Sequence, residues 1–252
     1  MTLEFVDPPG VWIRTEYHDA DMVIVRDVIE EDCYRIRDLP RPIHFAMDIG
    51  AHIGAFSVAL SRQRPESKIA CVEANPANIE CLKKNAVSVA MSADRQGRQV
   101  EPLAIVSPCA CTYAGHVRLL SSVFDGTQNT GGSFVEPFTK HAWKQLPNAH
   151  EYRDAGNVRS RTLDSLLDDV IRWPQIDVLK LDCEGSEFSI LEKARCLDRI
   201  GVIVGEQHDE KRFAELVERR FPRDEWTLDI LRGGTPGLFR LSRADWWNMA
   251  GK

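Results

Sequence analysis

Four acidic side chains stand where β-strands are predicted to end, and this placement is the clearest chemical feature of the chain. They are Asp48, Glu73, Asp182 and Glu206. In a mainly parallel sheet the carboxyl ends of the strands meet at one edge, where open α/β folds bind their ligands. Four carboxylates would repel one another in a dry core. The sequence therefore predicts a wet or cation-binding crevice at that edge.

Two glycines follow the first of these acids, in the stretch AMDIGAHIGAFSVAL (46–60). Gly50 permits a sharp turn, and Gly54 lets the next helix approach the strand. Glu73 comes 19 residues after Gly54, where a carboxylate can accept both hydroxyls of a ribose. The spacing is not the dinucleotide pattern G-x-G-x-x-G, and Asp48 in place of its first glycine would repel a pyrophosphate. A ligand with cationic ammonium and sulfonium groups, such as S-adenosylmethionine, suits the turn better.

Apolar runs alternate with helical periodicity over most of the chain, and these elements must position the acids. Strands are predicted at 41–50, 68–76, 100–107, 176–185 and 200–208, and helices at 53–63, 77–89, 161–171, 186–197 and 210–221. Residues 226–241 indicate two strands joined by a glycine-rich turn. The alternation predicts a mainly parallel sheet with helices on both faces and an antiparallel edge. From 108 to 160 the pattern is weak, with a strand at 117–124 and a loop at 125–134.

Length and composition limit the possibilities further. The 252 residues suit one large domain with decoration, divided here into an N-terminal extension over 1–42 and a main domain over 43–252. A formal net charge of -6 gives no reason to expect nucleic acid as a partner. No run of about 18 apolar residues predicts a membrane span. Seven scattered cysteines without a CxxC pair, and a start without a signal pattern, favour reduced thiols and a cytoplasmic location.

Five segments together resemble the FkbM family of S-adenosylmethionine-dependent methyltransferases: DIGAHIGAFS, VEANP, RTLD, LKLDCEGSEF and GEQH. LKLDCEGSE is the most specific, although Cys183 stands where the family more often has valine or isoleucine. The resemblance covers roughly residues 20–210. It implies a class I methyltransferase fold, which is a doubly wound, Rossmann-like α/β fold with a mainly parallel seven-stranded sheet and an antiparallel last strand. It also implies S-adenosyl-L-methionine as cofactor and often O-methylation of sugars or natural products.

The cofactor residues expected from the motifs and the resemblance lie mostly at strand ends. They are Tyr34, Asp48, Gly50, Ala51, His52, Gly54, Glu73, Ala74, Asn75, Ala104 and Asp182. Asp48 would meet the methionine end or cap a helix, and His52 would touch the same end or be an exposed turn residue. Ala74 and Asn75 would flank the adenine, which Ala104 at the end of the third strand would line. Tyr34 is either a cofactor contact or a core residue.

The expected catalytic residues are His208, Glu184, Asp182 and Glu206. Because the sulfonium already activates the methyl group, the protein must align an acceptor oxygen and remove its proton. His208 is the first choice of base, and Glu184 or Asp182 the second. Glu184 has the alternative role of holding Lys180 or a backbone turn. No metal is assigned because no spacing is diagnostic, although oxygen ligands and a histidine gather here.

The expected function is therefore O-methylation of a small molecule or glycan, with the oligomeric state left open. A nicotinamide-dependent oxidoreductase is an alternative that the turn spacing and Asp48 oppose. A non-catalytic Rossmann-like binding module is a second alternative, which the acids retained at four strand ends oppose. A nucleic-acid methyltransferase would need a basic face, which the net charge does not suggest.

Overall fold

The main sheet of the computed structural model has seven strands in the order β12-β13-β11-β10-β3-β4-β5. The structure describes residues 2–39, 42–95, 97, 99–107, 109–112, 114–124, 127–136 and 151–246. The strands are β3 (Phe45–Ile49), β4 (Lys68–Val72), β5 (Ala104–Val106), β10 (Ile176–Leu181), β11 (Ile200–Gln207), β12 (Trp226–Arg232) and β13 (Gly237–Arg243). Neighbours from β11 to β5 are parallel, whereas β13 runs antiparallel between β11 and β12. This topology confirms the doubly wound sheet with an antiparallel last strand.

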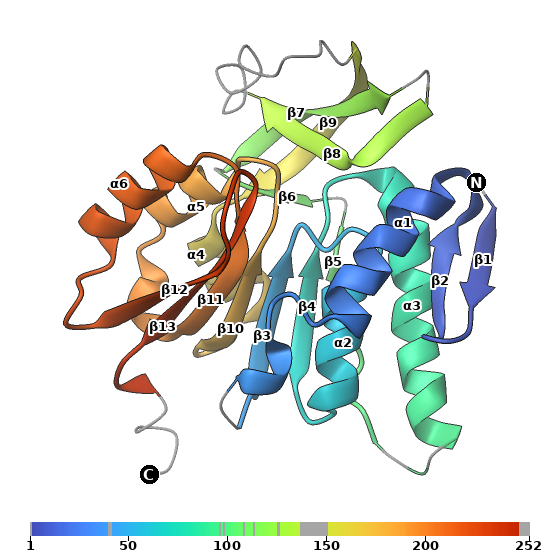
Figure 1. Ribbon diagram of the computed structural model, residues 1–252, viewed down its shortest axis with the longest axis horizontal. Coiled ribbons are helices and arrows are strands. Elements are labelled where there is room, and N and C mark those ends of the chain that lie inside the picture. Colours follow the sequence, from blue (N-terminus) through green and yellow to red (C-terminus); the bar gives the residue numbers. More distant parts are fainter. Residues whose placement is uncertain are drawn as a thin grey trace.

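Helices cover both faces of this sheet (Figure 1), as the alternating elements predict. One face carries α2 (Ala55–Gln63) and α3 (Pro76–Arg95), and the other carries α4 (Leu163–Ser165), η5 (Leu166–Ile171), α5 (Glu187–Lys193) and α6 (Glu210–Arg220). Successive strand residues point to opposite faces. Met47 and Ile49 of β3 accordingly join one apolar core, and Ala46 joins the other. Thr162 caps α4, since its side chain accepts a hydrogen bond from the Ser165 amide.

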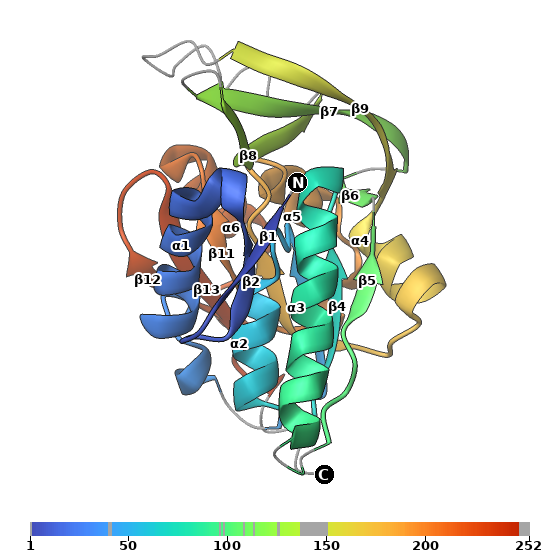
Figure 2. The same cartoon turned by 90° about the vertical axis from the view of Figure 1, so that its right-hand side faces the viewer.

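The N-terminal residues form a further layer over α2 and α3 (Figure 2). This layer holds the hairpin β1 (Leu3–Val6) and β2 (Val11–Arg14), then η1 (Thr15–Tyr17), α1 (His18–Val25), η2 (Arg26–Glu30) and η3 (Ile36–Asp38). Val11 and Val25 share an apolar cluster with Ile53 and Val89. Trp12 is also bonded to α3, because its amide donates to Asn85 Oδ1 at 2.7 Å.

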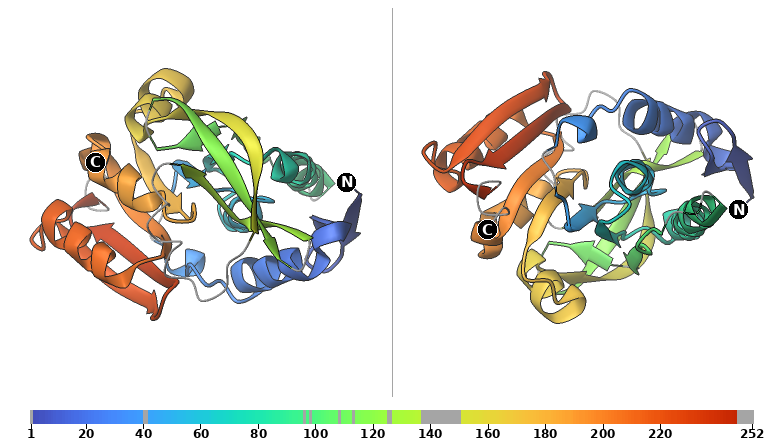
Figure 3. Two further views of the ribbon diagram at one scale, coloured as in Figure 1. Left: turned by 90° about the horizontal axis from the view of Figure 1, so that it is seen from above. Right: turned by 90° about the horizontal axis from the view of Figure 1, so that it is seen from below.

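A second sheet lies beyond the carboxyl ends of the main strands (Figures 1 and 3). Its four strands, in the order β6-β9-β7-β8, are β6 (Cys109–Cys111), β7 (Gly115–Phe124), β8 (Thr127–Glu136) and β9 (Glu151–Arg161). The predicted strand at 117–124 falls within β7. The predicted loop at 125–134 is wrong, because most of it is β8, paired along β7. Pairing to a neighbouring strand here overrides a polar, glycine-containing sequence.

The structure also bears on the predictions made for the cysteines and for membrane spans. All seven cysteines are free thiols. In the described part of the chain, no helix combines the length and the apolar character that crossing a membrane requires.

Candidate active site

A cavity of about 470 Å³ opens at the carboxyl ends of β3, β4 and β10. Most residues predicted for the site line it: Tyr34, Gly50, Ala51, His52, Glu73, Ala74, Asn75, Asp182, Glu184 and Glu206. Four predicted residues do not line it: Asp48, Gly54, Ala104 and His208. The structure thus brings three of the four strand-end acids, Glu73, Asp182 and Glu206, to one cavity, and Asp48 is among the four predicted residues that do not line it.

The glycine turn after β3 is shaped by contact with the end of β10. Gly50 has φ +75°, and a Cβ on it would lie 1.8 Å from the carbonyl oxygen of Asp182. Only glycine therefore lets these two strand ends come so close. Gly54 (φ +89°) is the N-cap of α2, and a Cβ there would lie 2.7 Å from Leu82 Cδ1. Its close neighbour is thus a side chain of α3 rather than the preceding strand.

Glu73 directly follows β4 and is only 6% exposed, and three hydrogen bonds hold its carboxylate in place. Its Oε2 accepts a hydrogen bond from the His52 amide at 2.7 Å, and its Oε1 accepts from the Asn75 amide at 2.6 Å and Asn78 Nδ2 at 3.1 Å. Burial raises the pKa of Glu73, and these donors oppose the rise. A carboxylate offers about four acceptor directions. Three are occupied here, two on Oε1 and one on Oε2, so Glu73 keeps about one on Oε2 for a ligand's hydroxyl.

Asp48 does not line the cavity, and its predicted contact with the methionine end, direct or through water, stays a prediction. It is fully buried, 3.1 Å from Lys180 Nζ through Oδ1, and its Oδ2 accepts a hydrogen bond from Ser57 Oγ. The register of β3 on β10 sets Asp48 beside Lys180. Lys180 in turn donates to the Gly50 carbonyl at 2.6 Å. Burial alone would lower the pKa of Lys180, but Asp48 and Asp182 raise it. Asp48 therefore supports the glycine turn through this lysine.

Carboxylates gather with His208 at the carboxyl ends of β10 and β11. The ring of His208 contacts Glu187 through Nδ1 at 2.7 Å, and its Nε2 lies 3.5 Å from Glu184 Oε2 and 4.0 Å from Glu206 Oε2. Glu187 is 1% exposed and also accepts from the Gly185 amide. The Tyr34 hydroxyl donates to Asp182 Oδ2 at 3.0 Å. His208 thus stands behind the cavity wall, fixed by a buried acid.

Burial and neighbouring charges shift the pKa values in this group. Burial raises the pKa of Glu184 to about 8, and burial together with Asp182 raises that of Glu206 to about 7. Burial would lower the pKa of His208, but Glu187, followed by Glu184 and Asp182, raises it to about 10. In this arrangement His208 is an imidazolium at neutral pH.

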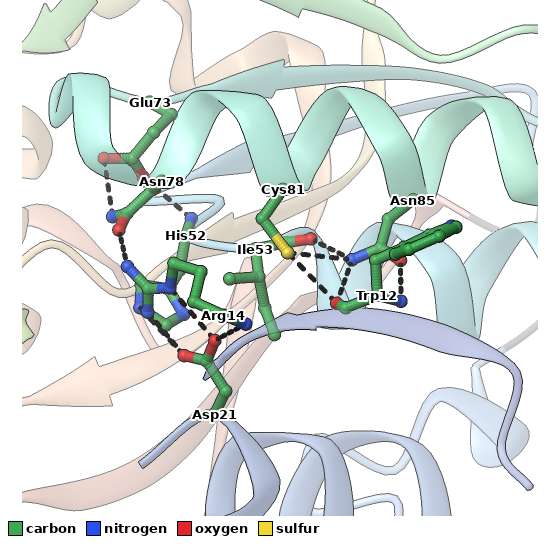
Figure 4. A network of polar contacts seen from close by, with 9 residues as sticks. All are labelled: Trp12, Arg14, Asp21, His52, Ile53, Glu73, Asn78, Cys81 and Asn85. Atoms are coloured by element: carbon green, nitrogen blue, oxygen red, sulfur yellow. Dashed lines mark hydrogen bonds and ion pairs between the residues drawn. The ribbon is translucent and has the colours of Figure 1, made fainter. Parts of the chain in front are cut away.

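A polar network joins the N-terminal layer to Glu73 in the cavity wall (Figure 4). Arg14, which is 1% exposed, donates through Nε to Asp21 Oδ2 at 3.0 Å and through Nη1 to Asn78 Oδ1. Its Nη2 lies 2.8 Å from His52 Nε2. Since Asn78 and the His52 amide both bind the Glu73 carboxylate, Arg14 helps to fix that carboxylate from a strand outside the main sheet.

Sequence reasoning missed this network and part of the cavity wall. Arg14 and Asp21 belong to no recognisable sequence motif. Thr112 and Leu119, which line the cavity, come from the region where the sequence pattern is weak. Glu187 lies inside LKLDCEGSE, but its contact with His208 is a tertiary one that no spacing reveals. Ala104 is exposed at the first position of β5, so its predicted position at the end of that strand is wrong. It does not line the cavity, and its place beside the adenine stays a prediction.

A family model described as a methyltransferase FkbM domain matches residues 48–225. The chain belongs to the FkbM methyltransferase family. The resemblance in the motifs is thereby confirmed, and S-adenosylmethionine is the cofactor. Methyltransferase sdnD from Sordaria araneosa is similar to this FkbM methyltransferase, with 26% identity and 67% of each chain covered.

Two solved structures are similar to this FkbM methyltransferase at low identity. An O-methyltransferase from Bacillus cereus in complex with SAH has a TM-score of 0.49 at 11% identity and covers 92% of this chain and 91% of its own. A precorrin-6y C5,15-methyltransferase from Geobacter metallireducens GS-15 has a TM-score of 0.46 at 14% identity, with 84% and 85% covered.

The cavity of this FkbM methyltransferase fits the family's cofactor in size and chemistry. Its volume of about 470 Å³ lies within the usual range for small-molecule sites. Apolar side chains such as Ile49, Val72 and Leu119 alternate in the wall with the fixed carboxylate of Glu73. A ligand with an aromatic base, a ribose and cationic groups finds complementary groups in such a wall.

We expect His52→Asn to make this FkbM methyltransferase less sensitive to acid. His52 is 14% exposed, and burial, Arg14 and Lys180 lower its pKa well below 6.5. Below pH 6.5 His52 therefore binds a proton in the unfolded chain but not in the folded chain. The free energy of unfolding falls as the pH falls for this reason. Relative to the variant, the wild type should lose about 1.4 kcal/mol between about pH 7.5 and about pH 5.5.

Urea unfolding at the two pH values measures this difference. Asparagine is a suitable replacement because residue 52 has φ +52°, a conformation that asparagine tolerates. His18→Asn is the matched control, because its ring is 48% exposed. An equal loss of stability in the wild type and His52→Asn would show that His52 does not cause the acid sensitivity.

Proposed function

We propose that this methyltransferase transfers a methyl group to a hydroxyl of a small molecule or glycan. The observation that carries the proposal is a single cavity with two chemically different ends. One end holds the fixed carboxylate of Glu73, and the other holds Glu184, Glu206 and Asp182. A hydroxyl is a weak acid, so its methylation needs a proton acceptor near the reacting oxygen. The second end of the cavity offers such acceptors.

The residues proposed to hold S-adenosylmethionine line the cavity between these ends. Glu73 would accept a ribose hydroxyl through Oε2, with Ala74 and Asn75 beside the adenine. The turn from Gly50 to His52 would face the methionine end, and Asp182 the amine. Tyr34, which donates to Asp182, would fix that carboxylate. When bound, the cofactor supplies a methyl group already activated by its sulfonium.

Glu184 is proposed as the group that accepts the proton of the acceptor hydroxyl, in the ionised form that predominates above its pKa of about 8. Its side chain lines the cavity and is 34% exposed, whereas His208, the first choice from the sequence, does not line it. His208 is assigned a positioning role, because Glu187 holds its Nδ1 and its Nε2 faces Glu184. Glu184 also keeps a left-handed backbone (φ +54°), and strained residues of this kind cluster at functional sites.

The proposal includes a cytoplasmic enzyme that does not act on nucleic acid. The seven free thiols support a reducing compartment. The formal net charge of -6 supports an acceptor other than a polyanion.

Two measurements test the proposal. Calorimetric titration with S-adenosylhomocysteine should give binding near one site per chain, and titration with NAD should give none. Incubation with isotopically labelled S-adenosylmethionine and a panel of sugars, glycans and phenols should yield products that are heavier by one methyl group on oxygen. Binding of S-adenosylhomocysteine together with transfer only to nitrogen or carbon acceptors would overturn O-methylation and leave the methyltransferase assignment in place.

A further inference from the structure

The ends of β10 and β11 bring three potential metal ligands together at one edge of the cavity. One ligand atom each from Asp182, Glu206 and His208 lies within 4.8 Å of the others. We propose that these side chains bind one divalent cation, Mg²⁺ or Mn²⁺, which orients the hydroxyl of the methyl acceptor. This inference rests on the proposed function, because it places the cation where the acceptor would enter.

Acidic side chains outnumber basic ones at this edge, within the part of the chain that the structure describes. Asp182, Glu184, Glu187 and Glu206 adjoin Lys180 or His208, and Arg232 contacts both Glu206 and Asp27. A divalent cation would take the place of the proton on Nε2 of His208. Two carboxylates with one imidazole form a ligand set that suits Mg²⁺ or Mn²⁺.

Each proposed ligand is already oriented by a partner on its far side. Glu187 holds His208 through Nδ1 at 2.7 Å, so that Nε2 faces the carboxylates. Tyr34 donates to Asp182 Oδ2 at 3.0 Å, and Arg232 lies 3.6 Å from Glu206 Oε1. Histidines that bind metals almost always donate their other ring N–H to an acceptor such as a carboxylate. The contact between His208 and Glu187 matches this arrangement.

Ser186, four residues after Asp182, supplies an independent sign that this cavity takes a ligand. The residue is 2% exposed and lines the same cavity. Its Oγ has no hydrogen-bond partner among the residues that the structure describes. A buried hydroxyl without a partner is costly, and the oxygen of an acceptor or of a cation-bound water would satisfy it.

A cation at this edge would complement Glu184. It would hold the acceptor oxygen and stabilise the alkoxide that forms when the proton leaves. Glu184, which lines the cavity beside the three ligands, would receive that proton.

Direct binding of Mn²⁺ tests the proposal without relying on catalysis. Protein treated with a chelator and then desalted is titrated with Mn²⁺, and electron paramagnetic resonance measures the free ion. We expect one site per chain in the wild type. Asp182→Asn, Glu206→Gln and His208→Gln should each weaken it by roughly tenfold or more. Asp224→Asn and Glu215→Gln, which alter exposed acids, are matched controls and should leave it unchanged.

Titration of every variant with S-adenosylhomocysteine separates this proposal from the proposed function. A wild type that binds S-adenosylhomocysteine but binds no Mn²⁺ at millimolar concentration would overturn the cation site alone. Binding of Mn²⁺ that survives all three ligand substitutions in folded protein would overturn it as well. Failure to bind S-adenosylhomocysteine would instead count against the proposed function. Thermal melting confirms that each variant is folded.

Discussion

Lys180→Met should lower the free energy of unfolding by about 3–5 kcal/mol, because it leaves the buried carboxylate of Asp48 without its cation. Asp48 is fully buried, and the side chain of Lys180 is 5% exposed. Methionine has nearly the length of lysine and fills much of its volume. The loss should therefore reflect the uncompensated charge, together with the hydrogen bond that Lys180 donates to the Gly50 carbonyl.

A double-mutant cycle separates these two contributions. Asp48→Asn removes the charge and can keep the hydrogen bond from Ser57. The double variant should therefore be more stable than the sum of the two single losses predicts. Urea unfolding measures all four proteins, with the exposed Lys211→Met as control. A loss below about 1 kcal/mol in Lys180→Met would mean that the pair behaves like a surface ion pair.

Glu184→Gln should lower kcat by about 10²–10⁴-fold while the affinity for S-adenosylhomocysteine stays within about threefold. Glutamine keeps the size of the side chain and can still contact His208, but it cannot accept the acceptor's proton. The cofactor end of the cavity is untouched, because Glu73 and its donors belong to other elements.

Single-turnover transfer measures the chemical step, and calorimetry measures binding. Glu215→Gln on the exposed face of α6 is the matched control and should keep wild-type turnover. If Glu184→Gln kept full turnover, the proton would go to another group, and Asp182 or Glu206 would be the next candidate. A parallel loss of cofactor affinity would instead indicate that the left-handed turn at Glu184 and Gly185 had changed shape.

Local pattern was enough to predict the main sheet and the side of it that carries the cavity. Gly50 and Glu73 were found because their roles depend on the turn and strand end in which they stand. The predicted helix at 161–171 appears as α4 and η5, capped by Thr162. Each of these signals is contained within a few residues.

The remaining features depend on contacts between distant segments, which one sequence does not display. Asp48 was expected in the cavity because the register that sets it against Lys180, 132 residues later, cannot be read from either strand. The link from Arg14 through Asn78 to Glu73 likewise joins three separate elements. In the second sheet, strand pairing rather than apolar alternation determines β8, so its polar sequence indicated a loop.

The pairing of Asp48 with Lys180 also has a consequence for synthesis on the ribosome. At about 5–20 residues per second, roughly 7–26 seconds pass between the translation of these two residues. During that interval β3 can pair with β4, but Asp48 lacks the cation it needs for burial in the finished protein. The nascent chain must therefore keep this strand hydrated, or held by a chaperone, until the second half emerges. A truncated product that stops before Lys180 should be insoluble or rapidly degraded.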